Sequence, residues 1–217
     1  MNIIQSIMTQ NPCYKAGKKI NVKGLMLHSV GCPQPSAKAF INSWNKATFD
    51  RACVHAFIDG NTGDVYQTLP WNHRGWHGGG SCNDTHIGVE MCEPTTNDLA
   101  TVKKTYETAV LLFSWLCKQY NLNPLSDGVI LSHSEGHKRG IASNHADPEH
   151  LWKKLNTGYT MNTFRNAVKM AMAQSSSVGG TDGLYRVQVG AYRKKANAEA
   201  MLTKLKKAGF DGIIKRT

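Results

Sequence analysis

Two short apolar runs in this chain each end in a histidine, and this pattern restricts the possible folds more than any other. His28 closes the run Gly24–Leu27, and His133 follows the run that begins with Val129. A segment rich in Gly, Ser and Asn comes after His133, is expected to be a loop rather than a helix, and ends at Asp147. Imidazoles at strand ends together with a loop carboxylate suit a zinc ion that keeps an open fourth position. Spacing alone fits ordinary polar residues at strand ends equally well, because the chain has nine histidines.

Apolar periodicity along residues 1–174 alternates between the strand type and the helix type. Strands are expected at 24–29, 54–59, 64–69, 87–92 and 129–131, and helices at 36–48, 98–120 and 163–173, after a loop-rich lead-in at 1–22. Gly60–Gly63 has the composition of a hairpin turn between the second and third strands. Strands that alternate with helices predict an α/β fold with a mixed central sheet flanked by helices. No apolar run reaches the length that spans a bilayer, so no membrane insertion is expected.

The C-terminal part differs from the rest in composition and charge. Residues 175–183 are rich in Ser and Gly and predict a flexible linker between a domain at 1–174 and a module at 184–217. The module has the pattern of one βαβ unit, with strands at 185–189 and 212–215 around a helix at 197–208. The formal charge of the chain is +11, and nine Lys or Arg against two acidic residues place +7 of it in this module. Such a charge favours nucleic acid, anionic lipid or an acidic cell-wall polymer as a partner, although a merely solubilising surface has the same composition.

The cysteines and the first residues bear on the compartment. The six cysteines are scattered without CxxC spacing, which indicates reduced, mostly buried thiols rather than a disulfide framework. The N-terminal segment places its positive charge after a short mixed stretch, the reverse of a secretory signal. We therefore expect synthesis in the cytoplasm and, for any role outside it, export by another route.

Two further residues are candidates for acid–base chemistry. Glu90 stands in a predicted strand on the face opposite Val89, where it could act as a general base on water or form an ion pair with a Lys or Arg. His145 comes two residues before Asp147 and is expected near the metal. In its protonated form His145 could stabilise the oxyanion of a tetrahedral intermediate.

An alternative ligand pair, His133 and His137, does not fit the zincin pattern. That pattern needs Glu directly after the first His and a continuous helix, whereas Ser134 and Gly136 stand at the critical positions.

The segment from Trp71 to Gly80 joins aromatic residues and a histidine to glycines. Trp71, Trp76 and His77 are expected to form a cleft for a sugar or peptide, since flat rings stack on sugar faces. The His-Gly-Gly-Gly string at 77–80 is also found in the oxyanion loop of lipases, but the chain has no G-x-S-x-G motif. The lipase interpretation therefore fails.

Taken in order, four landmarks over residues 23–170 resemble the zinc-dependent N-acetylmuramoyl-L-alanine amidases of type 2, which share their fold with the peptidoglycan recognition proteins. The landmarks are Leu27-His28-Ser29, Trp76-His77-Gly78, Ile87-Gly88-Val89-Glu90, and His133 with Asp147-Pro148. The resemblance implies that His28, His133 and Asp147 bind Zn²⁺. It further implies that Glu90 is the catalytic acid/base of a peptidoglycan hydrolase, which cleaves the amide between N-acetylmuramic acid and L-alanine with zinc-activated water.

The chain departs from the family pattern at two positions. His145 stands where many members have a Lys that stabilises the oxyanion, and this substitution resembles a Gram-positive autolysin variant. Glu149 replaces the Gly that often follows the Asp-Pro pair.

The C-terminal module resembles one repeat of a SPOR-type cell-wall-binding domain, a family that normally carries two. Such a half-domain is too small for a self-sufficient core, so it should either dock on its own catalytic domain or pair with the same unit of a second chain. The resemblance favours pairing, because two repeats normally share one sheet, so we expect a homodimer through residues 184–217. The expected partner is bacterial peptidoglycan, with no nucleic acid. The combination resembles a phage endolysin of a Gram-positive host, released through a holin pore, with a host autolysin as the alternative.

Two hypotheses from other classes remain open from the sequence. One is a non-catalytic peptidoglycan-binding receptor with the same fold. The other is a cysteine peptidase of the cell wall, with Cys53 or Cys32 as its nucleophile.

Overall fold

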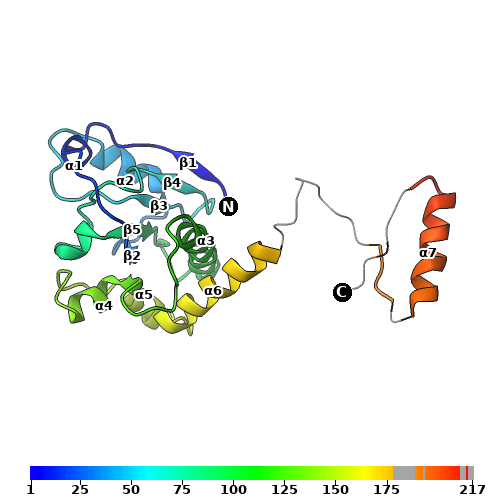
Figure 1. Ribbon diagram of the computed structural model, residues 1–217. Coiled ribbons are helices and arrows are strands. Elements are labelled where there is room, and N and C mark those ends of the chain that lie inside the picture. Colours follow the sequence, from blue (N-terminus) through cyan, green and yellow to red (C-terminus); the bar gives the residue numbers. More distant parts are fainter. Residues whose placement is uncertain (178–188, 193, 211–213, 215–217) are drawn as a thin grey trace. The chain divides into compact units, whose positions relative to one another are not determined.

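The chain folds into two compact units, Met1–Val178 and Gly179–Thr217 (Figure 1). The computed structural model describes residues 1–177, 189–192, 194–210 and 214. The strands predicted at 185–189 and 212–215 therefore lie almost entirely outside the described residues. None of the described helices is long and apolar enough to span a membrane.

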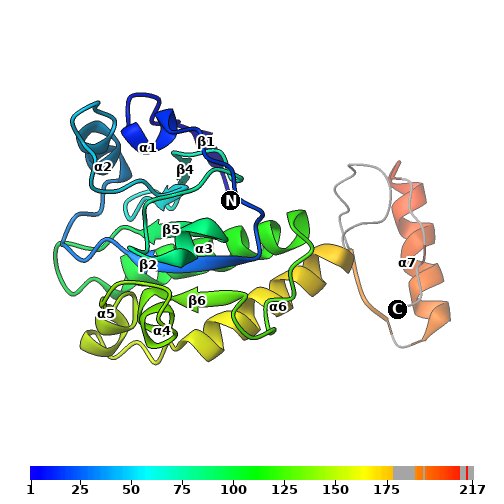
Figure 2. The ribbon, with the colours of Figure 1, turned by 60° about the vertical axis from the view of Figure 1, so that its left-hand side comes forward.

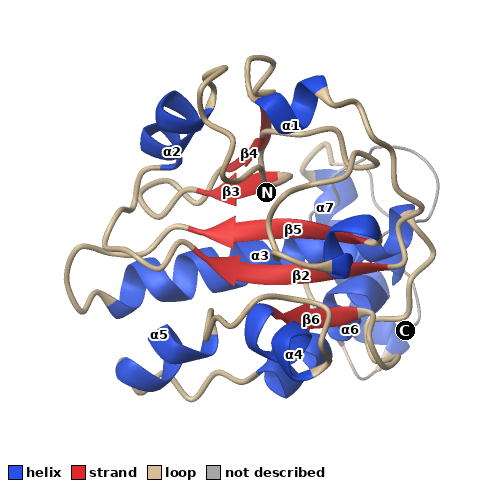
Figure 3. Ribbon diagram, turned by 90° about the vertical axis from the view of Figure 1, so that its left-hand side faces the viewer, coloured by secondary structure: helices blue, strands red, loops and turns tan. Residues whose placement is uncertain are grey.

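The first unit is built on a six-stranded sheet with the order β1-β4-β3-β5-β2-β6 (Figure 3). The strands are β1 (Ile3–Gln5), β2 (Gly24–Ser29), β3 (Ala56–Ile58), β4 (Val65–Gln67), β5 (His86–Met91) and β6 (Ile130–Ser132). β3 and β4 form the predicted antiparallel hairpin, and the other neighbouring pairs are parallel. The mixed central sheet of an α/β fold is thus confirmed.

Two long helices, α3 (Leu99–Gln119) and α6 (Met161–Ser177), cover one face of the sheet (Figures 2 and 3). Phe113 of α3 and Phe164 of α6 share the main core with Leu27 and Val89, which point to this face from β2 and β5. The side chain of Asp98 caps α3 by accepting hydrogen bonds from the first backbone amides, as its position before the apolar periodicity predicts.

The opposite face carries the site. All six residues of β2 are buried, which explains why its sequence is an apolar run rather than an alternating one. Met26 of β2 packs with Cys82 and Leu131 in a separate small cluster on this face. His28 and Glu90 are register partners on β2 and β5, near the carboxyl ends of these parallel strands.

The segment after β6 differs from the expected loop, because it contains the helices α4 (His133–Lys138) and α5 (Glu149–Lys154). A capping box starts α4: the Glu135 amide donates to the Ser132 hydroxyl, and the Ser132 amide donates to the Glu135 carboxylate, at 3.0 and 3.2 Å. His133 is thus the first residue of a helix rather than the last of a strand.

The two ends of the first unit also contain more regular structure than expected. The lead-in forms α1 (Pro12–Lys15) and the edge strand β1, which pairs in parallel with β4. α6 continues to Ser177, so the first residues of the predicted linker are helical. The remaining elements, α2 (Ala37–Trp44) and the short 3₁₀ helix η1 (Ser81–Asp84), lie on the face that carries the site or at its edge.

In the second unit the structure describes one helix, α7 (Lys195–Lys207), close to the predicted bounds. None of its residues is buried. Around it, the side chains of Phe210 and Val189 are 65% and 54% exposed. The described part of this unit therefore leaves apolar surface in contact with solvent.

Candidate metal centre and active site

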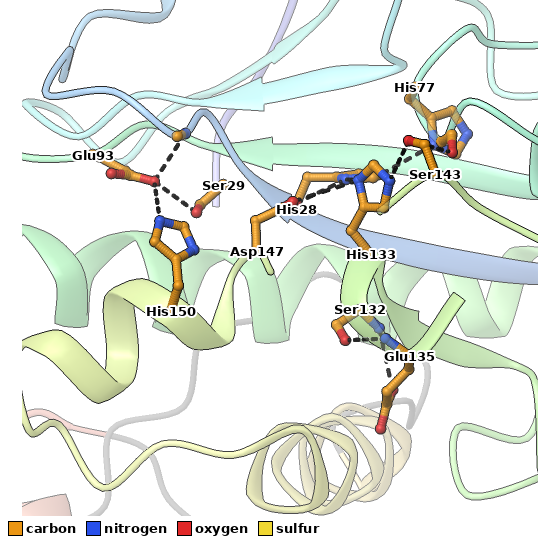
Figure 4. Close-up of polar contacts among 12 residues, drawn as sticks. His28, Ser29, His77, Glu93, Ser132, His133, Glu135, Ser143, Asp147 and His150 are labelled. Atoms are coloured by element: carbon orange, nitrogen blue, oxygen red, sulfur yellow. Dashed lines mark hydrogen bonds and ion pairs between the residues drawn. The ribbon is translucent and has the colours of Figure 1, made fainter. Parts of the chain in front are cut away.

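Three side chains that are far apart in the sequence meet at one end of the sheet (Figure 4). His28 comes from β2, His133 from the start of α4, and Asp147 from the turn before α5. All three are buried, and one ligand atom from each lies within 4.8 Å of the others. The sequence predicted this grouping. Parallel strands end at the same edge of a sheet, and β2 and β6 are neighbours there.

The hydrogen bonds around the two imidazoles direct one nitrogen of each toward the centre of the group. Nε2 of His77 lies 3.0 Å from the backbone carbonyl of His86, which can only accept, so this nitrogen carries the proton. Nδ1 of neutral His77 then accepts from Nε2 of His28 at 3.0 Å. Nε2 of His133 donates to the Ser143 hydroxyl at 3.1 Å, and this hydroxyl donates to the Gly78 carbonyl at 3.3 Å. The Nδ1 atoms of His28 and His133 are left to face each other and Asp147.

The distances between the two imidazole nitrogens and the two oxygens of Asp147 are close to those between the ligand atoms of a tetrahedral zinc site. The two Nδ1 atoms are 3.1 Å apart, and Asp147 oxygens lie 3.0 Å from Nδ1 of His28 and 3.5 Å from Nδ1 of His133. Tetrahedral zinc with bonds of about 2.0–2.1 Å places neighbouring ligand atoms about 3.3 Å apart. Two imidazole nitrogens and a carboxylate that face one another could hold a metal ion, and this donor set is one that zinc accepts.

The electrostatics of the group also favour a positive charge at its centre. Burial acts to lower the pKa of His28, but the hydrogen bond to Asp147 and the charges of Glu90 and Asp147 outweigh it and raise this pKa. Burial acts to raise the pKa of Asp147, but the same hydrogen bond and the two histidines hold it below its usual value. Burial and His28 lower the pKa of His133 to about 4, so this imidazole is neutral and able to bind a metal.

Glu90 lies beside the group without belonging to it. Its Oε2 is buried and has no hydrogen-bond partner among the described residues. Burial raises the pKa of Glu90 to about 7, with a smaller opposing effect of His28. No Lys or Arg in the described part of the chain forms the ion pair with Glu90 that the sequence allowed. A buried carboxyl group with a pKa near neutrality is suited to accept and return a proton.

A cleft of about 600 Å³ opens over these residues and includes His145 and Trp76 in its wall. The His145 ring stacks on the His133 ring, with centroids 4.6 Å apart and an angle of 24° between planes. His145 is exposed, so it can reach a substrate that lies over the metal ligands. His145 thus lies beside the candidate ligand His133, and its predicted role at a metal stays a prediction.

The other predicted substrate contacts are placed differently. Trp71 packs on Trp115 and the main core, and it is not part of the cleft wall. Its apolar ring packs between the turn segment and α3, and its predicted contact with substrate stays a prediction. His77 borders the cleft, but both of its ring nitrogens already have partners in the protein. Of the three, Trp76 remains a candidate for stacking on substrate.

Sequence reasoning missed a second buried carboxylate, Glu93, just after β5 (Figure 4). It accepts from the Ser29 hydroxyl at 2.7 Å and the Gly31 amide at 2.9 Å, and Nε2 of His150 lies 3.7 Å away. Glu93 thereby ties the end of β2 to α5 and shapes the cleft wall. Nothing in the local sequence distinguishes it from a surface Glu, because its partners are distant in the chain.

Neither cysteine proposed as a nucleophile has an activated thiol. Cys53 is completely buried, and a hydrogen bond with Cys13 and burial raise its pKa. Cys32 is exposed, yet partial burial and the nearby charges of Glu93 and Glu90 raise its pKa as well. A thiolate nucleophile needs the opposite environment, so the cysteine-peptidase hypothesis has no support here.

Two family profiles match the sequence. Residues 18–150 match the profile described as N-acetylmuramoyl-L-alanine amidase, and residues 142–216 match that of the SPOR domain. The SPOR match begins well before the predicted module and includes α5 and α6 of the first unit. The chain is also similar to the bifunctional autolysin of Staphylococcus aureus, with 25% identity over 142 residues. That match covers 63% of this chain but only 11% of the autolysin.

Solved structures share the fold. The Staphylococcus aureus hydrolase AmiA, solved in complex with its ligand, matches with a TM-score of 0.68 and 20% identity over 82% of this chain and 86% of that one. A mutant endolysin from Bacillus subtilis matches with a TM-score of 0.57 and 23% identity, covering 77% of this chain and 99% of that one.

Proposed function

Because the chain belongs to the N-acetylmuramoyl-L-alanine amidase family, we propose that it is a zinc-dependent peptidoglycan hydrolase. The bond it cleaves is the amide between the lactyl group of N-acetylmuramic acid and L-alanine. The observation that carries the proposal is the pairing of a His, His, Asp group with Glu90, whose buried Oε2 has no hydrogen-bond partner among the described residues.

In this proposal His28, His133 and Asp147 hold Zn²⁺. A zinc ion bound there would lower the pKa of a water molecule and polarise the substrate carbonyl. Glu90 takes a proton from the attacking water and returns a proton to the departing amine. The C–N bond breaks, and the products are a lactyl carboxylate and the free amine of L-alanine.

The end groups released from a cell wall test this reaction directly. Digestion of purified peptidoglycan should release L-alanine amines and no new reducing sugars. A rise in reducing sugars without new amines would identify a glycosidase and overturn the proposal.

His145 is proposed to stabilise the oxyanion of the tetrahedral intermediate. His145→Ala should reduce kcat by about 10²–10³-fold, the usual effect of losing one oxyanion donor. Zinc content should stay near that of the wild type, because the ring stacks on His133 rather than joining the ligand group. His137→Ala is a matched control, since His137 is an exposed histidine of α4 outside the cleft. Loss of zinc in His145→Ala, measured by atomic absorption, would instead make His145 a ligand.

The second unit is proposed to bind the cell wall, in line with the SPOR match. Five lysines lie in α7 or directly before it, and their positive charge suits an anionic polymer. They are Lys194, Lys195, Lys204, Lys206 and Lys207. We propose in addition that two copies of this unit pair, because Phe210 and Val189 are exposed and α7 buries none of its residues. Pairing would cover this apolar surface and bring two basic surfaces to the wall together.

Ending the chain after Ser177 tests both statements. The cut leaves α6 complete, so a folded, zinc-binding first unit is expected, with weaker sedimentation on purified walls. Light scattering at tens of micromolar should give a dimer for the full chain and a monomer for the shortened one. Unchanged wall binding at low and moderate salt would remove the targeting role, and a monomeric full chain would remove the pairing.

A further inference from the structure

We propose that His77 is a positioning residue for the metal site: it accepts the Nε2 proton of His28 and so holds Nδ1 of His28 toward the metal. The inference rests on the zinc site of the proposed function. It gives His77 a role different from substrate binding.

The hydrogen bonds define a relay of fixed direction. The backbone carbonyl of His86 accepts from Nε2 of His77 at 3.0 Å, and Nδ1 of His77 lies 3.0 Å from Nε2 of His28. A carbonyl cannot donate, so the proton of His77 is on Nε2. Nδ1 of His77 then accepts, and Nε2 of His28 donates to it. His28 is left with its proton on Nε2 and a lone pair on Nδ1, the tautomer that a metal ligand at this position needs.

The His77 ring lies against two other imidazoles, those of His28 and His55, with centroids 5.2 and 5.7 Å away. Its two ring nitrogens face Nε2 of His28 and the backbone carbonyl of His86, so the ring connects the candidate ligand to β5.

Packing holds the His77 ring in place from several sides. A Cβ on Gly88 would come within 2.4 Å of the ring, and a Cβ on Gly75 within 2.7 Å. The Asn83 side chain accepts from the backbone amides of His77 and Gly78 at 3.0 and 2.9 Å. These contacts explain why residue 88 is a glycine: a side chain at this position of β5 would collide with the His77 ring.

An imidazole is an uncommon acceptor for a metal-bound histidine. The usual partner is a carboxylate, a backbone carbonyl or water, and losing it typically costs 10–100-fold in metal affinity. His133, by comparison, donates to Ser143, a hydroxyl on the segment between α4 and α5. The partner of His28 is therefore His77, which the carbonyl of His86 in β5 holds in place. The partner of His133 is Ser143, which lies in a segment without regular structure.

Two substitutions of His77 distinguish the loss of the Nδ1 acceptor from the loss of the imidazole ring as a whole. In His77→Asn the amide oxygen can take the place of Nδ1 and still accept from His28. In His77→Gln the amide nitrogen can take the place of Nε2 and bond the His86 carbonyl, but no acceptor faces His28. We expect zinc affinity, measured by chelator competition, to fall about 10–100-fold in His77→Gln and by clearly less in His77→Asn. The absorption of the Co²⁺-substituted protein should change in His77→Gln.

His55→Gln is the matched control. His55 is fully buried beside the His77 ring and bonds the His73 carbonyl and the Gly88 amide at 2.9 and 3.0 Å, but neither of its ring nitrogens contacts a candidate metal ligand. The His55→Gln substitution should lower thermal stability without lowering the zinc affinity of the folded protein. Equal affinity losses in His77→Gln and His77→Asn, or in His77→Gln and His55→Gln, would overturn the proposal.

The wild-type protein supplies a measurement that needs no variant. Long-range ¹H–¹⁵N spectra of protein labelled at histidine should show His77 protonated on Nε2 and unprotonated on Nδ1 when zinc is bound. A proton on Nδ1 of His77 would overturn the proposal. Both readouts are taken without peptidoglycan, so failure of the amidase assignment does not affect them.

Discussion

Replacing Glu90 with Gln should lower kcat of peptidoglycan cleavage by about 10²–10⁴-fold, the range attributed to a general acid/base. Gln matches Glu in size but cannot take the proton of the attacking water. Zinc content should remain near one ion per chain, because Glu90 lies outside the group of ligand atoms. Release of L-alanine amines from purified walls, with metal analysis of the same samples, measures both quantities.

The pH profile adds a second test of Glu90. A general base must be deprotonated, so the rate should rise with pH through the pKa of Glu90. Burial raises this pKa to about 7, while a bound cation acts in the opposite direction, which places the acid limb of the wild-type profile at or below pH 7. The limb should be absent from the residual activity of the Gln variant. A Glu90→Gln protein that has lost its zinc would show that Glu90 is a ligand.

Replacing Asp147 with Ala should abolish both zinc binding and wall lysis. Asp147 approaches both histidines, at 3.0 and 3.5 Å, and it is the carboxylate of the proposed ligand group. Without it the two imidazoles would hold zinc alone, and no third protein ligand would complete the site. Treatment of the wild type with a chelator should give the same loss, reversed by added zinc.

Glu149→Gln is the control for that variant. Glu149 stands two residues after Asp147, and its Oε2 is buried with no hydrogen-bond partner among the described residues. It should keep its zinc and most of its activity. If Glu149→Gln lost the metal and Asp147→Ala kept it, the carboxylate ligand would be Glu149, and the proposed ligand group would be wrong.

The sequence predicted the inner residues of the site because their signal is local. An apolar run marks each strand, and the first polar residue at its end marks the edge of the sheet, so His28 and His133 could be placed together. The sheet itself was predicted for the same reason. Glu90 was assigned to its face by the alternation along β5.

The residues around the site could not be found in this way. Ser143, Glu93 and the partners of His77 are brought to the ligands by contacts between segments that local periodicity does not encode. The packing of Trp71 on Trp115 could not be predicted either, because an aromatic ring in a turn suits a cleft and a core equally well.

α4 is a different case, since its signal was present in the sequence. Ser132 and Glu135 have the spacing of a capping box. This cap outweighs the low helix propensity of Ser134 and Gly136 within α4.

The spacing of the three ligands along the chain gives the metal a second effect, as a reversible cross-link. His28 is separated from His133 by 105 residues and from Asp147 by 119, so a bound ion closes most of the first unit into loops. An unfolded chain would have to close these long loops to hold the ion with all three side chains, so it binds the ion much more weakly than the folded protein does. Each tenfold rise in free zinc above the dissociation constant should add about 1.4 kcal/mol to the free energy of unfolding. Zinc starvation would therefore remove enzyme molecules through unfolding and proteolysis as well as through loss of catalysis.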